Sequence, residues 1–249
     1  MSRAPREYSE SGFYHVTVRA NGKQILFEDD ADYHAFLDMG AESLEPRSVT
    51  LLAWCLMSNH VHLIVDDPDG RLSEAMGVLL TKYAKRFNDL TGHVGNVFEA
   101  RFRSFPIEDE NYLLYAVRYV HNNPVRAGMC ACPADYRWSS YHEYVSGTGI
   151  SNTAIVIDML DGVAGFEAFM NEEDTSGYHP GKGRRLTTEE ALEIARQVLG
   201  GMEPHDVGGL DKPRRDELLR RLRRAGLSVR QIERLTGVGK NTISRVTSK

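Results

Sequence analysis

The stretch Ser48-Val-Thr-Leu-Leu-Ala-Trp-Cys-Leu-Met-Ser-Asn-His-Val-His-Leu-Ile-Val-Asp66 predicts a hairpin of two β-strands. The first strand, 48–57, is largely apolar, and residues 58–59 supply a polar, tight connection. Side chains alternate between the two faces of a strand, so His60 and His62 point to one face while the residues between and after them point into a core: Val61, Leu63 and Val65. Two imidazoles side by side on a rigid strand can bind a divalent cation. Ordinary packing of a histidine pair is the alternative, and the motif alone does not decide between them.

Strands and helices alternate on both sides of this hairpin. The segment 13–19 is rich in β-branched and aromatic residues and predicts a strand, which a helix follows. A helix over 72–88, a strand over 98–107 and a helix over 109–122 come after the hairpin. The order β-α-β-β-α-β-α predicts an α+β fold of the ferredoxin-like kind. Such a fold has an antiparallel sheet with helices on one face, and we expect the two hairpin strands to be its central pair.

Length and composition set the broad class. The 249 residues, 41% of them hydrophobic, suffice for one large domain with a small appendage. No apolar run reaches about 18 residues and the N-terminus lacks the apolar stretch of a secretory signal, so we expect a soluble, cytoplasmic protein without membrane contact. Three cysteines are too few for a disulfide framework, and we expect them to be reduced and incidental.

Charge divides the chain into an acidic body and a basic end. Residues 212–249 hold twelve Lys and Arg against three acidic residues, a balance of +9, which leaves −14 on the other 211 residues, given the formal net charge of −5. This distribution indicates a basic module attached to an acidic body. We therefore expect three parts: a main domain over 1–145, an acidic, Gly-rich connector with short helices over 146–211, and the basic module over 212–249.

The basic end has the pattern of a helix-turn-helix. Helices are predicted over 216–225, 229–236 and 241–246, with Ser228 as the N-cap of the second and a turn over 237–239 before the third. The last helix of such a unit enters the major groove, which would bring four side chains near DNA: Lys240, Asn241, Thr242 and Arg245. A three-helix protein-interaction module with a solvated basic face is the alternative.

The predicted helix over 109–122 has an apolar stripe and a second face rich in tyrosine. Tyrosines recur on that face at spacings of three to four residues as far as Tyr119, and Asn123 follows four residues later. Tyr119 and Asn123 therefore project together. Any one of the chain's 11 tyrosines can be ordinary packing, and Tyr83 is a rival candidate for a functional role.

Seven stretches within residues 8–145 form a wider pattern. In chain order they are Tyr14-His-Val-Thr-Val-Arg-Ala-Asn-Gly22, Phe27-Glu-Asp-Asp30, Met57-Ser-Asn-His-Val-His-Leu63, Tyr83-Ala-Lys-Arg-Phe-Asn88, Gly95-Asn-Val-Phe-Glu-Ala-Arg-Phe102, Tyr119-Val-His-Asn-Asn-Pro-Val125 and Asp135-Tyr-Arg-Trp-Ser-Ser-Tyr141. In this order and spacing they resemble the IS200-like single-tyrosine (Y1) transposases, in particular the group linked to repeated extragenic palindromes (REP). The third stretch resembles the HUH metal motif of that family. Glu99 and Ser58 depart from the residues common in relatives, but neither change removes a reactive group.

The resemblance implies a metal-dependent DNA strand transferase. His60 and His62 would hold Mg²⁺ or Mn²⁺ with Asn123 as third ligand, and either Asn122 or His121 could replace Asn123. Tyr119 would be the nucleophile that forms a 5′-phosphotyrosine link and frees a 3′-hydroxyl. The implied substrate is single-stranded DNA, beside or within a hairpin.

Other partners and functions follow from charge and from the same resemblance. Five basic residues of the main domain are candidate phosphate contacts by charge alone: Lys85, Arg86, Arg101, Arg103 and Arg126. The basic module would add binding to duplex DNA, and the protein would act as a monomer or a homodimer. Two alternatives remain: a non-catalytic, sequence-specific DNA-binding regulator derived from a transposase, and a metal phosphodiesterase that uses water while Tyr119 is structural.

Overall fold

The computed structural model of the chain describes residues 8–174, 176–181, 188–227 and 229–247. It separates into two compact units, residues 1–184 and 185–249, and each is described by itself. Within the described ranges, no helix has both the length and the apolar composition needed to cross a membrane. The predicted N-cap Ser228 lies outside the described residues.

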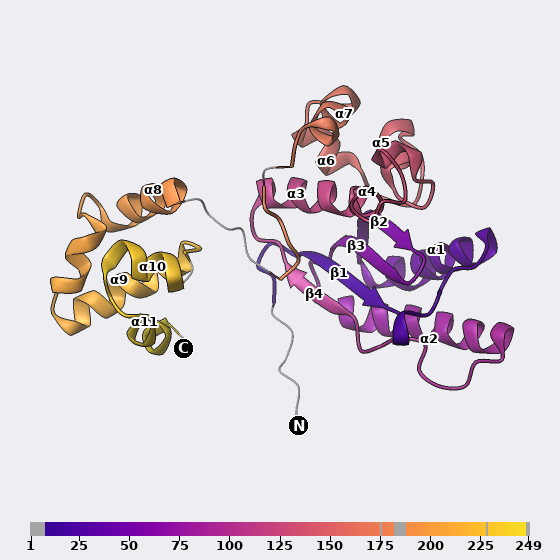
Figure 1. The fold of residues 1–249 in the computed structure, drawn as a ribbon, viewed down its shortest axis with the longest axis horizontal. Coiled ribbons are helices and arrows are strands. Elements are labelled where there is room, and N and C mark those ends of the chain that lie inside the picture. The colour runs from indigo at the N-terminus through magenta and orange to yellow at the C-terminus, as the bar shows by residue number, and fades with distance from the viewer. Residues whose placement is uncertain (1–7, 175, 182–187, 228, 248–249) are drawn as a thin grey trace. The chain divides into compact units, whose positions relative to one another are not determined.

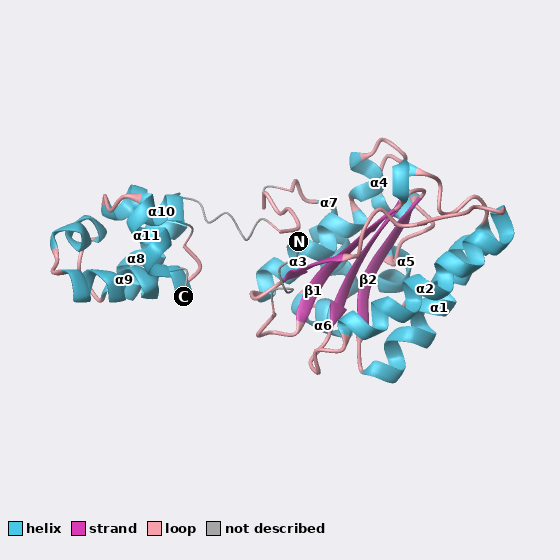
Figure 2. Ribbon diagram, turned by 90° about the horizontal axis from the view of Figure 1, so that it is seen from below, coloured by secondary structure: helices cyan, strands magenta, loops and turns pink. Residues whose placement is uncertain are grey.

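Four antiparallel strands form the sheet of the first unit: β1 (Phe13–Arg19), β2 (Thr50–Met57), β3 (His60–Asp66) and β4 (Arg103–Pro106). Their order is β2-β3-β1-β4, so β3 and β1 are the central strands and β2 lies at an edge (Figure 2). The predicted antiparallel sheet is confirmed. The prediction that β2 and β3 are the central pair is wrong, because β1 pairs with the second side of β3. The fourth strand is also shorter than predicted, since the chain before it makes only one bridge to β1's end, between Ala20 and Phe98.

Helices α1 (Asp30–Leu44) and α2 (Leu72–Thr91) cover one face of the sheet (Figure 1). Alternate residues of the central strands point into this layer and share one apolar core with the two helices. That core includes Val16, Val18, Val61, Leu63, Phe36, Met76 and Leu79. The predicted direction of Val61, Leu63 and Val65, away from the histidines, is therefore confirmed.

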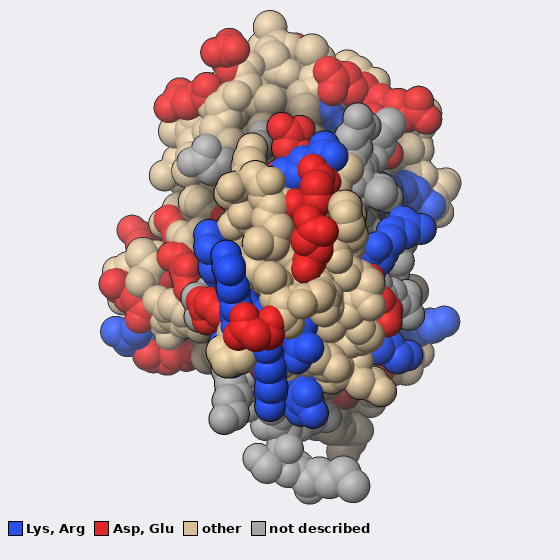
Figure 3. All heavy atoms as spheres, turned by 90° about the vertical axis from the view of Figure 1, so that its left-hand side faces the viewer, with Lys and Arg blue, Asp and Glu red and all other residues tan. Residues whose placement is uncertain are grey.

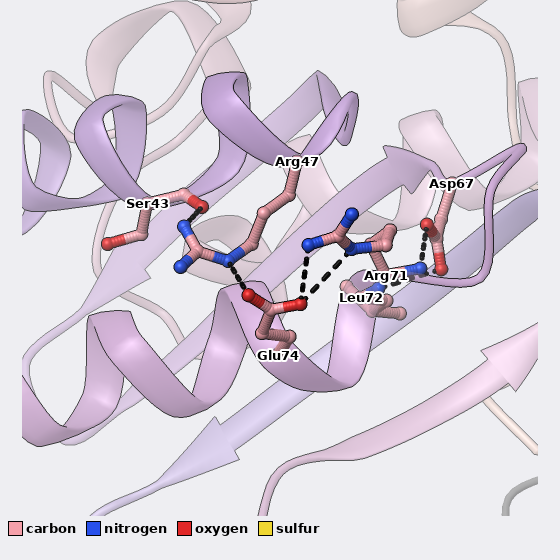
Figure 4. A network of polar contacts seen from close by, with 6 residues as sticks. All are labelled: Ser43, Arg47, Asp67, Arg71, Leu72 and Glu74. Atoms are coloured by element: carbon pink, nitrogen blue, oxygen red, sulfur yellow. Dashed lines mark hydrogen bonds and ion pairs between the residues drawn. The ribbon is translucent and has the colours of Figure 1, made fainter.

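The turn after β3 fixes the start of α2 (Figure 4). The buried Asp67 carboxylate accepts hydrogen bonds from the backbone N–H of Arg71 at 2.7 Å and of Leu72 at 2.9 Å. One turn into α2, Glu74 pairs with Arg71 at 2.7 Å and with Arg47 at 3.1 Å. Side-chain oxygens that satisfy the first N–H groups of a helix stabilise it and set where it begins. The histidine strand and α2 are thus held in a fixed relation.

The opposite face of the sheet is covered as well, by α3 (Glu110–His121), α4 (Asn123–Arg126), α5 (Tyr141–Ser146), α6 (Ala154–Met159) and α7 (Val163–Asn171) (Figures 1 and 2). The prediction of helices on one face is therefore wrong. All residues of β2 from 51 to 57 are buried, so this strand needs an apolar cover on both faces. The apolar stripe of α3 supplies that cover against Ala53, Cys55 and Ile64.

Part of the predicted connector belongs to this core. Val156 of α6 and Phe166 of α7 are fully buried in it, so residues 154–171 are a folded layer and not a linker. Short 3-10 helices complete the chain's regular structure at Asn21–Lys23, Glu45–Arg47, Pro133–Asp135 and Pro204–Gly209.

The described residues of the second unit form helices joined by turns. The unit contains α8 (Thr188–Leu199), α9 (Lys212–Arg224), α10 (Val229–Thr236) and α11 (Lys240–Thr247), which share a core that includes Ala195, Val207, Leu219, Leu222, Ile232 and Ile243. The three helices predicted in the basic end are present. The predicted boundary at 212 differs from the observed one, because α8 and the 3-10 helix over 204–209 pack into the same core.

Candidate active site

The histidine pair lies on the sheet face that α3 covers. His60 and His62 point to the same side of β3, and their ring centroids are 5.2 Å apart. His62 is buried, whereas His60 is half-buried at the end of the strand. In the sheet, Thr17 and Cys55 flank His62 on the two neighbouring strands. The pair is therefore rigidly placed by three strands.

Each imidazole of the pair has one nitrogen in a hydrogen bond and, among the described residues, one without a partner. His60 Nδ1 donates to Asn59 Oδ1 at 2.7 Å, and His62 Nδ1 shares a hydrogen bond of 2.8 Å with Nε2 of His15. Over the described ranges, no hydrogen bond engages Nε2 of His60 or His62. Metal-binding histidines use one ring nitrogen for the cation and the other for an orienting hydrogen bond, so this pair fits a divalent cation. Among the described residues, no group of three or more His, Cys, Asp or Glu side chains is arranged so that it could hold a metal ion, so further ligands would be amide, water or phosphate oxygens.

His15 is a further functional candidate that the sequence pattern does not single out. It lies fully buried on β1, on the same sheet face as His62, and its Nδ1 shares a hydrogen bond of 2.8 Å with the Tyr178 hydroxyl. The rings of His15 and Tyr178 are nearly parallel. The only local signal is a titratable residue inside an apolar strand, between Tyr14 and Val16. Tyr178 lies in the predicted connector, where no sequence pattern points to a functional role.

Burial keeps these imidazoles neutral. It lowers the pKa of His15 to about 3 and lowers the pKa of His62 well below its usual range, with further lowering from His15 and His60. The pKa of His60 is lowered by burial first and by Arg19 second. A neutral imidazole keeps the lone pair that binds a metal, so the electrostatics of the face suit ligation near neutral pH.

Tyr119 is brought to the histidine face by α3. Asp109 caps this helix by accepting a hydrogen bond from the backbone N–H of Tyr112 at 3.0 Å. The Tyr119 ring centroid lies 5.8 Å from that of His62 and 5.7 Å from that of His15. The guanidinium carbon of Arg126 lies 4.7 Å from the same ring centroid. The structure therefore joins the predicted tyrosine to the predicted histidine pair within one chain.

The rival tyrosine is excluded from this site. Tyr83 belongs to the core on the other sheet face, is 1% exposed, and donates its hydroxyl to the carbonyl oxygen of Leu26 at 2.7 Å. Burial raises its pKa. Tyr83 is thus a structural residue.

The three candidates for a further ligand differ in their surroundings. Asn123 donates through Nδ2 to the carbonyl oxygen of Tyr119 at 2.9 Å, and its Oδ1 has no hydrogen-bond partner in the described part of the chain. Asn122 donates to the carbonyl oxygen of Arg118 at 3.2 Å. His121 is fully buried, pairs through Nε2 with Ser140 Oγ at 2.8 Å, and packs against Tyr144 and other core rings. His121 therefore belongs to the core and is not available as a ligand.

The basic residues predicted as phosphate contacts do not form one patch. Lys85 and Arg86 lie on α2, on the other side of the sheet, and pair with Asp89 and Asp32. Arg126 is the one of the five that contacts Tyr119, and it also pairs with Asp174. Arg101 and Arg103 are exposed, and Arg101 lines a groove of about 770 Å³ beside α2.

A second pocket opens beside His60. It has a volume of about 650 Å³ and is lined by His60, Asn59, Arg19, Asn21, Lys23 and Glu99. Two cations, two amides and the carboxylate of Glu99 line it, and the excess of one positive charge suits a polar, anionic ligand. Arg19 and Lys23 are further residues that the sequence analysis did not select.

Comparison with known proteins identifies the domain that carries this site. Residues 9–123 match the family described as Transposase IS200 like. This match covers slightly less than half of the chain. The predicted resemblance to this family is confirmed over that range, and so is the enzyme class, because members of this family cleave and rejoin DNA. The matched domain includes the three histidines, Tyr119 and Asn123, whereas Arg126 and Tyr178 follow its end.

Individual relatives share this domain at low identity. A REP-associated tyrosine transposase of Escherichia coli K12 is 24% identical over 148 residues, which cover 59% of this chain and 86% of the relative. A Haemophilus influenzae protein assigned to the same group is 22% identical over 156 residues, which cover 58% of this chain and 88% of the relative. The solved structure of a REP-associated tyrosine transposase bound to a REP hairpin matches 75% of this chain and 100% of its own, with a TM-score of 0.52 and 21% identity. That match confirms the fold of the IS200-like transposase domain.

Proposed function

We propose that this protein is a metal-dependent single-strand DNA endonuclease and strand transferase that acts through a 5′-phosphotyrosine intermediate. The observation that carries the proposal is the position of Tyr119 against His62, with ring centroids 5.8 Å apart. On the same sheet face, Nε2 of His60 and of His62 has no hydrogen-bond partner among the described residues. A nucleophile beside a cation-binding pair is the arrangement that phosphoryl transfer requires.

The proposed cation is Mg²⁺ or Mn²⁺, held by Nε2 of His60 and His62 with Oδ1 of Asn123 as the third protein ligand. When bound, such a cation polarises the scissile phosphate and neutralises part of its charge. The neutral imidazoles and the amide oxygen together suit a cation that must also accept a phosphate oxygen. Asn122 remains an alternative to Asn123.

The chain's own residues account for the covalent step. The Tyr119 hydroxyl oxygen bonds to phosphorus as the bond from phosphorus to the 3′-oxygen breaks, and the 3′-oxygen leaves with a proton as a hydroxyl. The phenol proton must be removed for this attack, because free tyrosine ionises only near pH 10. Arg126, 4.7 Å from the ring centroid, places a positive charge where the phenolate and the phosphate would be negative. Attack by another 3′-hydroxyl reverses the step and rejoins DNA without an external energy source.

The proposed substrate is single-stranded DNA next to a hairpin. The pocket lined by Arg19, Lys23 and Asn59 adjoins His60 and can receive a strand that crosses the histidine face. A relative of the same fold is bound to a REP hairpin, which supports hairpin DNA as the folded part of the substrate. Because Tyr119 lies beside the histidines of its own chain, one protomer can complete the site.

We assign duplex or hairpin-stem binding to α11 of the second unit. Ile243 and Val246 of α11 are buried in the core of this unit. Its polar residues lie on the other side of the helix, with Lys240, Asn241 and Arg245 exposed and Thr242 half-buried. Figure 3 shows Lys and Arg side chains spread over this unit, with acidic side chains among them. A second binding module on the same chain raises the local concentration of the first at its target.

The test is covalent trapping. A labelled library of single-stranded hairpins is incubated with protein and Mn²⁺ or Mg²⁺ and resolved on a denaturing gel, with Tyr119→Phe and Tyr83→Phe alongside. A metal-dependent adduct that Tyr119→Phe abolishes and Tyr83→Phe retains is the expected result. Cleavage without an adduct in both variants would instead indicate hydrolysis by water. Binding without cleavage would indicate a DNA-binding regulator.

A further inference from the structure

The proposed reaction uses Nε2 of His62 but leaves its other nitrogen unexplained. Behind His62, three buried side chains form a line: Tyr178 hydroxyl to His15 Nδ1 at 2.8 Å, then His15 Nε2 to His62 Nδ1 at 2.8 Å. The exposed fractions of His15, His62 and Tyr178 are 0%, 5% and 2%. Three polar groups in such a place are costly unless each is paired, so this line is a specific arrangement and not a surface contact.

We propose that His15 and Tyr178 are positioning residues that hold His62 in the tautomer whose Nε2 can bind the cation. This inference rests on the proposed metal-dependent function. Neither residue touches the cation or the DNA in this proposal; both act through His62.

The hydrogen-bond line can run in two directions. In the first, the Tyr178 hydroxyl donates to His15 Nδ1 and His15 Nε2–H donates to His62 Nδ1. His62 then carries its own proton on Nε2 and has no lone pair for a metal. In the second, His62 Nδ1–H donates to His15 Nε2 and His15 Nδ1–H donates to the Tyr178 oxygen. Only this second direction leaves the Nε2 lone pair of His62 free.

Tyr178 makes the second direction possible, because its oxygen can accept from His15 Nδ1–H. A hydroxyl both donates and accepts, so it satisfies His15 Nδ1 in either direction. With phenylalanine at 178, the second direction would leave the N–H of His15 buried without an acceptor, at the desolvation cost of an unpaired donor. The first direction would instead leave the buried lone pair of His15 Nδ1 without a donor, and an unpaired buried N–H is tolerated less well than an unpaired acceptor. Removing the hydroxyl should therefore favour the form of His62 that cannot bind metal.

The segment that carries Tyr178 is fixed to the site by several contacts. The Tyr178 ring packs against Tyr112 at 4.6 Å and Tyr119 at 5.4 Å between centroids. Asp174, four residues earlier, pairs with Arg126. This segment lies beyond the IS200-like match, which ends at residue 123, so a part of the chain outside that match completes the site.

His60 provides an internal contrast. Its Nδ1 is paired with Asn59, the preceding residue, whose Oδ1 can only accept, so its tautomer is fixed locally. His62 has no such neighbour, and its tautomer depends on residues 47 positions away and beyond. The two proposed ligands therefore adopt the same tautomer, which a neighbouring residue fixes for His60 and distant residues fix for His62.

The test measures Mn²⁺ affinity without DNA, from the electron paramagnetic resonance signal of free Mn²⁺, for the wild type, His15→Leu, His15→Gln and Tyr178→Phe. We expect about 10- to 100-fold weaker binding for His15→Leu and about 10-fold for Tyr178→Phe, the range for lost partners of metal ligands. His15→Gln should retain most of the affinity, because its amide oxygen can accept from His62 Nδ1–H. Tyr144→Phe is the matched control: it removes another buried hydroxyl, which donates to the carbonyl oxygen of Leu52 at 2.8 Å, and should bind Mn²⁺ as the wild type does.

The outcomes separate this proposal from the function it rests on. Wild-type affinity in a folded His15→Leu, or in Tyr178→Phe if His15→Leu does not fold, would overturn the positioning role and leave the metal site intact. A wild type that binds no Mn²⁺ would overturn the metal site, and the positioning role with it. Thermal unfolding of each variant shows whether it is folded, and equal stability with unequal affinity excludes a purely structural role.

Discussion

Replacing Arg126 by glutamine should slow formation of the covalent DNA adduct without unfolding the protein. The Arg126 guanidinium carbon lies 4.7 Å from the Tyr119 ring centroid, and 40% of the side chain is exposed. Two unit charges about 5 Å apart interact with an energy of about 3 kcal/mol at an effective dielectric constant near 20, and of about 1 kcal/mol in water. Exposure and the paired Asp174 both reduce the effect, so we expect a loss of about 1–2 kcal/mol, which is a rate about 5- to 30-fold lower.

The assay is single-turnover adduct formation on one labelled hairpin, at saturating protein so that weaker binding does not mimic a slower step. Lys85→Gln is the control, because it removes one positive charge that pairs with Asp89 on α2, on the far side of the sheet. An unchanged rate in Arg126→Gln would refute the electrostatic reasoning. An equal loss in both variants would show that total charge matters and that the position of Arg126 does not.

Four further outcomes follow from the same structure. Tyr83→Phe should keep adduct formation and lower the free energy of unfolding by about 1–2 kcal/mol in a urea titration, since only a buried hydrogen bond is lost. Burial lowers the pKa of His15 and of His121 to about 3, below the usual value of 6.5, so the unfolded chain takes up protons that the folded one does not. Unfolding free energy should therefore fall as pH falls below about 6.5, by about 1 kcal/mol per pH unit for each histidine, measured in urea from pH 7.5 to 5. Arg245→Ala should weaken binding to duplex DNA and reduce its salt dependence by about one phosphate contact in a fluorescence titration, while cleavage of a short hairpin is unchanged. Mixing Tyr119→Phe with His62→Ala protein should not restore adduct formation on a gel, because Tyr119 lies beside the histidines of its own chain.

The sequence predicted the element order but misjudged how the sheet is covered. Periodicity placed the first three strands and helices α1, α2 and α3 correctly, since each apolar pattern is local. It made the fourth strand too long and did not predict α4, α5 or α6. The same sequence held a signal against a single helical layer: residues 51–57 are apolar almost without interruption, as in strands that are buried on both faces. Alternation in β3, where His60 and His62 interrupt the apolar run, concealed that signal. The position of β2 at the edge depended on β1, which is far away in the sequence.

The residues of the candidate site also fall into two groups: some could be selected from the sequence and others could not. His60, His62 and Tyr119 could be selected because their spacing on one strand and one helix has a chemical meaning without knowledge of the fold. His15 and Tyr178 could not, because they are 163 residues apart and acquire meaning only through their contact. Residue spacing carries no information about partners brought together by a folded layer such as α6 and α7.

The packing of α3 favours a tyrosine that acts within its own chain. Leu113, Val117 and Val120 of α3 are at most 1% exposed and belong to the core that includes Cys55 and Ile64 of the sheet. Burying three such side chains stabilises the docked helix by about 5–9 kcal/mol, at about 1.5–3 kcal/mol each. To deliver Tyr119 to another protomer, the helix would have to leave this core, and the cost is comparable to the whole stability of a typical domain, about 5–15 kcal/mol. The contact between Tyr119 and His62 is thus a consequence of the same apolar stripe that holds the second helical layer on the sheet.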